Sequence, residues 1–135
     1  MGDDGRACIC DFGLSLLIEP SEFTSFKTAG ACRWTAPEIM SPPEDIPDSA
    51  SPFTFQSDIY AFAMTLIEVP FSAKKNDSSV IFSVLEGGRP PVPLFSEDSH
   101  FIGEVIKECW NQDPQLGPTS RAVVKKLDKE EVSIL

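Results

Sequence analysis

Apolar residues in the second half of the chain recur with the spacing of α-helices. Between residues 57 and 69 they cover nearly the whole circumference of a helix, which indicates a helix buried on all sides. Ser57 is a suitable N-cap, and Asp58 favours the positive end of the helix dipole. Because Pro70 cannot continue a helix, we expect the central helix to run from Ser57 to Val69.

Three amphipathic helices are expected after the central one. The first covers about residues 78–86 and would stop at Gly87, and the last begins near Pro118. Between them, residues 99–111 carry an apolar stripe at helical spacing that we expect to pack into the core. The stripe consists of Phe101, Ile102, Val105, Ile106, Cys109 and Trp110.

The first third of the chain lacks a helical period. Residues 6–10 have the pattern of a short buried strand after a turn at Asp4-Gly5, so we expect one or two short N-terminal strands. Such a turn normally joins two strands of a hairpin. Almost no sequence precedes this turn, so we expect the first strand of the hairpin to be missing and the chain to be a fragment of a larger domain. Residues 19–33 and the proline-rich stretch 41–53 are expected to be loops. The predicted fold is therefore mainly α.

Composition and charge exclude several classes of function. With 135 residues, 41% of them apolar, the chain can build the core of one domain. Its net charge of -10 would repel phosphates, so we expect no nucleic-acid partner. The longest strongly apolar run, Ile59 to Val69, is too short to cross a bilayer, and the N-terminus has no signal-peptide pattern. We therefore expect no membrane contact and a cytoplasmic location. The four cysteines form no Cys-x-x-Cys pair and there is one histidine, so a zinc site is not expected.

Short motifs occur in a definite order along the chain. Asp11-Phe12-Gly13 follows the expected strand, and Ala36-Pro37-Glu38 follows a polar stretch rich in serine and threonine. Each tripeptide alone is weak evidence, but their order and the helices after them resemble the C-terminal lobe of a eukaryotic protein kinase domain. An Arg-Trp pair before the second motif resembles the tyrosine-kinase-like branch of the serine/threonine kinases and also the tyrosine kinases themselves. The matching positions are Asp11, Phe12, Gly13, Arg33, Trp34, Ala36, Pro37, Glu38, Asp58 and Trp110.

The resemblance implies that residues 1–135 are a partial protein kinase domain, with an activation segment over 11–38 and a helical lobe over 55–130. In the family, the aspartate at the position of Asp11 binds the Mg²⁺ that bridges the ATP phosphates. Phosphate added to the activation loop pairs with arginines and orders the segment. Four hydroxyl groups are candidate acceptors of such a phosphate: Ser21, Thr24, Ser25 and Thr28.

Three positions depart from the family pattern. Ala31 replaces a threonine that usually contacts the catalytic aspartate, and the stretch from Glu68 to Phe71 lacks a few residues, including a glycine. Gly117 replaces an arginine that normally forms a buried ion pair with the glutamate at the position of Glu38. We expect that either Arg121 takes over this pairing or Glu38 turns towards solvent.

The sequence also lacks most of the groups that phosphoryl transfer needs. It has no Gly-x-Gly-x-x-Gly loop, no Val-Ala-x-Lys strand before residue 11 and no His-Arg-Asp motif, so no catalytic base is assigned. We therefore expect weak or no binding of Mg-ATP and no kinase activity of this chain alone.

The main interpretation is a truncated serine/threonine-type kinase domain, and two alternatives stay open. One is a catalytically dead, pseudokinase-like binding module that docks on a protein partner or a full-length kinase. The other is an unrelated helical domain with chance motifs. In the kinase-like interpretations the elements that usually flank the central helix are missing, so we expect exposed apolar surface and a tendency to aggregate.

Overall fold

The computed structural model of the chain describes residues 8, 31–42, 53–96 and 99–133. This part contains helices and no strand, which confirms the predicted mainly-α fold. The strand expected over residues 6–10 lies outside it, except for Cys8, which belongs to no strand. The elements are η3 (Cys32–Trp34), α2 (Pro37–Met40), α3 (Phe55–Thr65), α4 (Asp77–Leu85), α5 (Phe101–Cys109), η5 (Pro114–Leu116) and α6 (Ser120–Ser133).

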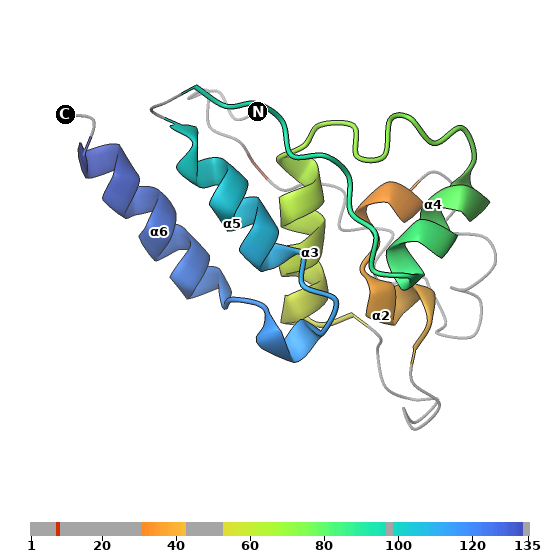
Figure 1. Cartoon of the computed structure of the whole chain (residues 1–135). Coiled ribbons are helices and arrows are strands. Elements are labelled where there is room, and N and C mark those ends of the chain that lie inside the picture. The colour runs from red at the N-terminus through yellow and green to blue at the C-terminus, as the bar shows by residue number, and fades with distance from the viewer. Residues whose placement is uncertain (1–7, 9–30, 43–52, 97–98, 134–135) are drawn as a thin grey trace.

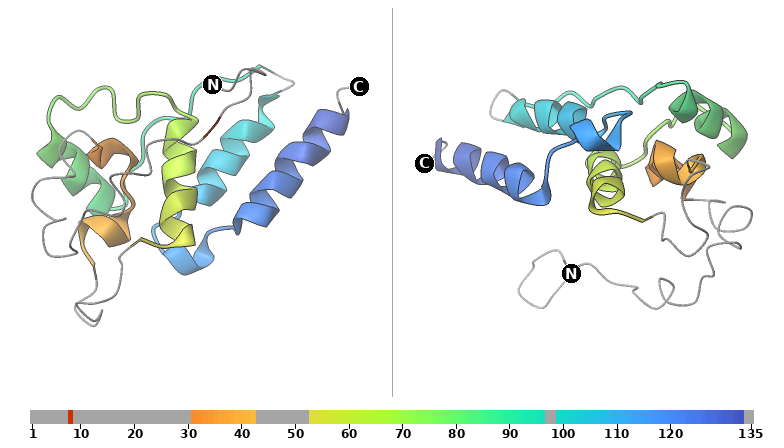
Figure 2. Two further views of the ribbon diagram at one scale, coloured as in Figure 1. Left: turned by 180° about the vertical axis from the view of Figure 1, so that it is seen from behind. Right: turned by 90° about the horizontal axis from the view of Figure 1, so that it is seen from below.

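Helix α3 lies in the middle of the described structure (Figure 1). On one side it packs against α5, and α6 packs against the outer side of α5. On the other side lie η3, α2 and α4, with η3 in contact with both α3 and α4. The views from behind and from below show the same arrangement of two helical groups on opposite sides of one central helix (Figure 2).

The start of α3 differs from the prediction. Its N-cap is Thr54, whose side chain accepts a hydrogen bond from the Ser57 amide at 3.1 Å, while the Ser57 hydroxyl accepts one from the Thr54 amide at 3.0 Å. The prediction that Ser57 is the N-cap is therefore wrong: Ser57 is the third helical residue of a reciprocal capping box. This box satisfies two backbone amides that would otherwise lack partners at the helix start, so α3 begins at Phe55.

The end of α3 also differs from the prediction. The helix ends at Thr65, with Leu66 as its C-cap, although the next proline in the sequence is Pro70. Residues after Leu66 turn back through Glu68, which has a positive φ of 68°. Pro70 excludes a longer helix but does not determine where the helix stops, because the chain must already be turning to bring Phe71 into the core.

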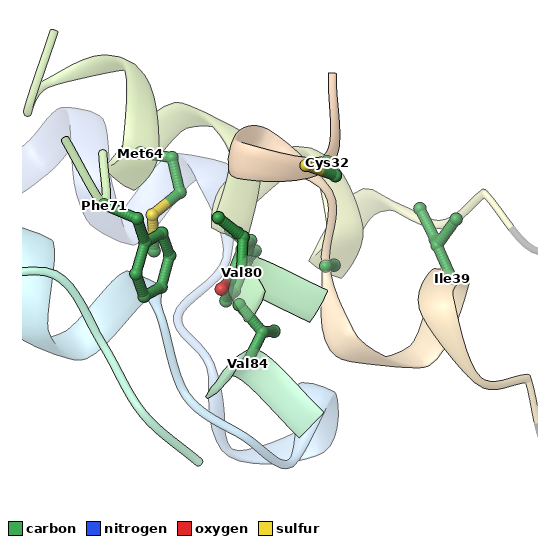
Figure 3. Packing of buried hydrophobic residues seen from close by; sticks show 8 residues of the cluster. Cys32, Ile39, Met64, Phe71, Val80 and Val84 are labelled. Carbon is green, nitrogen blue, oxygen red and sulfur yellow. The ribbon is translucent and has the colours of Figure 1, made fainter. Parts of the chain in front are cut away.

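Two hydrophobic clusters share α3 between them. Tyr60 and Met64 contribute to the first cluster, which joins α3 to η3, α2 and α4. Ile59 and Ala63 contribute to the second, which joins α3 to α5 and α6. Figure 3 shows the first cluster, where the side chains of Met64 and Phe71 lie beside each other. Its members are Cys32, Ala36, Ile39, Tyr60, Met64, Phe71, Val80 and Val84, and those of the second are Ile59, Ala63, Val105, Ile106, Cys109 and Val123.

Burial of α3 follows the prediction on these two faces. Between the two faces, Ala61 and Phe62 are only half-buried, so the helix is not covered on every side. Large apolar side chains are exposed at the start of α3 and elsewhere in the described part, which agrees with the expected exposed apolar surface. They are Phe53, Phe55, Val69, Phe82, Leu85, Leu94, Leu116 and Val124.

The three later helices match the predictions closely. Helix α4 is followed by Gly87 in a left-handed conformation with φ of 84°, as its predicted stop requires. The apolar stripe of α5 is buried or half-buried along its length. Helix α6 begins at Ser120, two residues after Pro118, and the Lys126 ammonium forms an exposed ion pair with the Glu108 carboxylate on α5. No described helix has both the length and the apolar character that crossing a bilayer requires.

We expect Ile106→Ala to destabilise the chain by about 3 kcal/mol, because it removes buried methyl groups and leaves a cavity between α3 and α5. Leu94→Ala is the matched control, since Leu94 is fully exposed and its truncation should change stability by less than ~0.5 kcal/mol. Urea unfolding followed by circular dichroism measures both values. Equal losses for the two variants would contradict the described core.

Candidate functional site

Some of the predicted site residues lie outside the described residues. These are Asp11, Phe12, Gly13 and the candidate phosphate acceptors Ser21, Thr24, Ser25 and Thr28. Their roles in binding Mg-ATP or phosphate therefore stay predictions. Among the described residues, no group of three or more histidine, cysteine or acidic side chains is placed to hold a metal ion.

The other motif residues include a continuous segment from Arg33 to Glu38 that packs against α3 and α4. The segment contains η3 and the start of α2, with Pro37 at the first position of that helix. Pro37 fits there because its missing amide would have no partner within the helix. Ala36 and Ile39 are buried in the first cluster, while Trp34 is packed against it and half-buried. Residues 31–40 are thus held mainly by apolar contacts with α3 and α4.

Arg33 adds a polar attachment to this apolar one. Its Nη1 donates hydrogen bonds to the carbonyl oxygens of Pro70 at 3.0 Å and Phe71 at 2.6 Å, and its Nη2 donates one to the Lys74 carbonyl oxygen at 2.8 Å. Hydrogen bonds from a charged donor are about twice as strong as neutral ones. Arg33 therefore binds the loop between α3 and α4 and is not free to pair with an acidic group.

Cys32, next to Arg33, is fully buried. Burial, followed by a hydrogen bond with the side chain of Asp77, raises the pKa of its thiol to about 11. Burial likewise raises the pKa of Cys109 to about 11. Both thiols are therefore protonated at neutral pH and are unsuited to nucleophilic chemistry.

Glu38 is half-buried at the start of α2 and forms no ion pair with any described residue. Burial raises the pKa of its carboxyl group, while its backbone hydrogen bond and the positive charge of Arg89 oppose the shift. Arg121 is exposed and forms no ion pair with Glu38, so it does not take the place of the arginine that Gly117 replaces. Glu38 has not turned fully to solvent either. The cation that influences its carboxyl group is Arg89, a pairing that the sequence did not predict.

Arg89 is held in place by its own hydrogen bonds. Its Nε donates to the Trp110 carbonyl oxygen at 2.7 Å, its Nη1 to the Gly88 carbonyl oxygen at 2.8 Å and its Nη2 to Gln112 Oε1 at 2.7 Å. Its Cζ lies 5.2 Å from the centroid of the Tyr60 ring, within the range of a cation–π contact. Arg89 thus attaches the turn after α4 to the end of α5 and to the central helix.

The Tyr60 hydroxyl is buried and has no hydrogen-bond partner among the residues that the structure describes. Burial raises the pKa of this phenol to about 12, with Arg89 lowering it and Glu38 raising it. Tyr60, Glu38 and Arg89 therefore influence one another electrostatically, although Glu38 forms no ion pair with a described residue. The sequence did not predict that these three residues lie close together, because they come from segments that are distant in the chain.

The remaining motif residues have different surroundings. Asp58 is exposed in the first turn of α3, as expected of a carboxylate that favours the start of a helix. Trp110 is half-buried and packs against both clusters.

A surface pocket of about 380 Å³ opens at the N-terminal end of α3. It is lined by Phe53, Thr54, Phe55, Gln56 and Asp58.

The comparison with known families identifies the class of this chain. A family described as "Protein tyrosine and serine/threonine kinase" matches residues 1–127. The chain therefore belongs to the protein kinase family, and its helical structure agrees with the C-terminal lobe of such a domain.

Several curated relatives are kinases by name. A "Light-sensor Protein kinase" of Ceratodon purpureus is 33% identical over 133 residues, which cover 88% of this chain and 10% of the relative. The "TGF-beta receptor type-2" of Rattus norvegicus is 26% identical, with 96% of this chain and 27% of the relative covered. The "Serine/threonine-protein kinase 12" of Arabidopsis thaliana is 30% identical, with 93% and 27% covered. The chain thus spans about a quarter or less of these relatives.

We expect Tyr60→Phe to stabilise the chain by about 1 kcal/mol, because it removes a buried hydroxyl without a partner and keeps the ring beneath Arg89. Tyr60→Leu, which also removes the ring, should instead be destabilising. Urea unfolding of the two variants checks both expectations. A clear loss of stability in Tyr60→Phe would show that the hydroxyl has a partner.

Glu38→Gln should stabilise the chain at neutral pH. Since burial raises the pKa of Glu38 in the folded state, its ionised form disfavours folding, and this contribution disappears below the ordinary pKa of a glutamate. The advantage of the variant over the wild type should therefore fade below about pH 4. Glu104→Gln is the control, because Glu104 is an exposed acid in the first turn of α5. The same pH dependence in both variants would contradict the assignment to burial.

Proposed function

We propose that this chain forms the substrate-facing, helical part of a serine/threonine protein kinase domain of the tyrosine-kinase-like type. In this proposal, residues 11–38 are the activation segment and residues 55–130 the helical lobe that supports it. The observation that carries the proposal is the attachment of the Arg33–Glu38 segment. Apolar packing on α3 and three hydrogen bonds from Arg33 hold the segment that would face a protein substrate.

The reaction of the whole domain would be transfer of a phosphoryl group from Mg-ATP to a protein hydroxyl. The Asp11 carboxylate would bind Mg²⁺, which needs anionic oxygen ligands. One carboxylate does not make a site for Mg-ATP, so we expect weak or no binding by these 135 residues alone. The proposal assigns the catalytic base and the phosphate-binding lysine to sequence outside them, and the short coverage of the curated relatives supports this.

A binding module without catalysis is the alternative function. Ala31, at the N-cap position of η3, favours this alternative because the family usually has a threonine here that contacts the catalytic aspartate. The partner would be a protein, either a separate target or a full-length kinase. The described cysteines Cys32 and Cys109 form no disulfide, which agrees with a reducing compartment, and both proposals include a cytoplasmic location.

The isolated 135-residue chain should transfer no phosphate. The test measures transfer from labelled ATP to a generic protein substrate, with the Asp11→Ala variant as background. We expect equal counts from the two proteins, because the chain contains no His-Arg-Asp motif to supply a base. Transfer by the wild type well above that background would contradict this expectation.

The mass of the endogenous product tests the proposal itself. A product larger than 14.8 kDa that carries an ATP-binding lobe and loses phosphotransferase activity on Asp11→Ala would support the kinase proposal. Recovery of the 14.8 kDa chain in a stable complex with a protein, without activity, would favour the binding module instead.

A further inference from the structure

The loop between α3 and α4 is held in an unfavourable backbone conformation. Two of its residues other than glycine have positive φ values, 68° at Glu68 and 54° at Phe71. Residues that carry a Cβ rarely adopt this left-handed backbone conformation, because it brings the Cβ close to the following carbonyl oxygen. Such a conformation persists only where surrounding contacts impose it.

Two sets of contacts impose the conformation on this loop. The Phe71 side chain is buried beside Met64 in the first cluster, which draws the loop towards α3 (Figure 3). The Arg33 guanidinium then binds the carbonyl oxygens of Pro70, Phe71 and Lys74. The Phe71 carbonyl oxygen also accepts a hydrogen bond from the Lys74 amide at 2.8 Å. Arg33 therefore binds to a turn that has a backbone hydrogen bond of its own.

Arg33 is fixed on its own side as well. Its neighbours Cys32 and Trp34 belong to η3, where Cys32 is fully buried and forms a hydrogen bond with Asp77 in the first turn of α4. The Trp34 amide donates a hydrogen bond to the Ala31 carbonyl oxygen at 2.9 Å, which closes the turn. A single guanidinium thus connects two rigid turns that lie 37 to 41 residues apart in the sequence.

We propose that Arg33 is a conformational latch that joins the η3 turn to the strained α3–α4 loop, so that the two segments open and close together. Release of Arg33 would remove one donor from each of three carbonyl oxygens, of which that of Phe71 would keep the Lys74 amide. It would also allow Glu68 and Phe71 to relax and give solvent access to Cys32. The latch follows from the geometry of these contacts and does not depend on the proposed kinase function.

Thiol labelling of the native chain tests the latch. Cys32 and Cys109 are both buried, but Cys32 lies beside Arg33 and Cys109 lies in the second cluster. Arg33→Lys keeps the positive charge near the Cys32 thiol and loses the planar fork of donors. We expect this variant to raise the labelling rate of Cys32 about tenfold, the effect of losing roughly one charge-assisted hydrogen bond, with little change at Cys109. Peptide mass spectrometry separates the two sites.

Arg89→Lys provides the matched control for this experiment. Arg89 also binds carbonyl oxygens through its guanidinium, but those of Gly88 and Trp110. This variant should not raise the labelling rate of Cys32 relative to that of Cys109. The proposal is overturned if Arg33→Lys accelerates both thiols equally or neither, or if Arg89→Lys favours Cys32 to the same extent.

The strain in the loop gives a second, independent measurement. Glu68→Gly should raise the midpoint of thermal unfolding by about 3 °C, because glycine adopts a positive φ without cost. In the Arg33→Lys variant the loop is already free to relax. The same Glu68→Gly substitution should therefore raise the unfolding midpoint by less than about half of the rise in the wild type. Equal gains in the two backgrounds would show that Arg33 does not impose the strain and would overturn the coupling.

Discussion

The described structure depends on one helix whose two opposite faces are both buried. Tyr60 and Met64 of α3 complete the cluster with η3, α2 and α4, and Ile59 and Ala63 complete the cluster with α5 and α6. Each cluster includes residues of α3, so neither helical group can bury its apolar side chains to the same extent without this helix. Loss of α3 would expose both clusters at once, which makes the two groups parts of one cooperative unit.

Polar contacts add positional precision to this apolar arrangement. Arg33 and Arg89 each direct a guanidinium at backbone carbonyl oxygens, the first towards the α3–α4 loop and the second towards the end of α5. Both arginines therefore stabilise turns between helices, whereas Glu38 has no direct counter-ion among the described residues. The cost of burying the Glu38 carboxylate is thus only partly offset, by its backbone hydrogen bond and by the more distant charge of Arg89.

The sequence predicted the helices better than their ends or their polar contacts. Apolar periodicity located α4, α5 and α6, and Gly87 marked the end of α4 correctly because a left-handed stop there requires glycine. The N-cap of α3 was misplaced from Thr54 to Ser57, since both side chains can cap and their pairing is a feature of geometry. The roles of Arg33 and Arg89 could not be predicted, because each binds a backbone carbonyl oxygen more than 20 residues away, and such contacts leave no pattern in the sequence.

Native-state amide hydrogen exchange of α3 tests the central claim most directly. If α3 is the shared core, its amides between Ile59 and Met64 should be among the slowest in the chain. They should also open with the same free energy as those around Ile106 in α5 and Val84 in α4, and with that of global unfolding measured in urea. Continued protection of α5 or α4 after the α3 amides have exchanged would contradict the account, because it would show that either helical group can persist without the central helix.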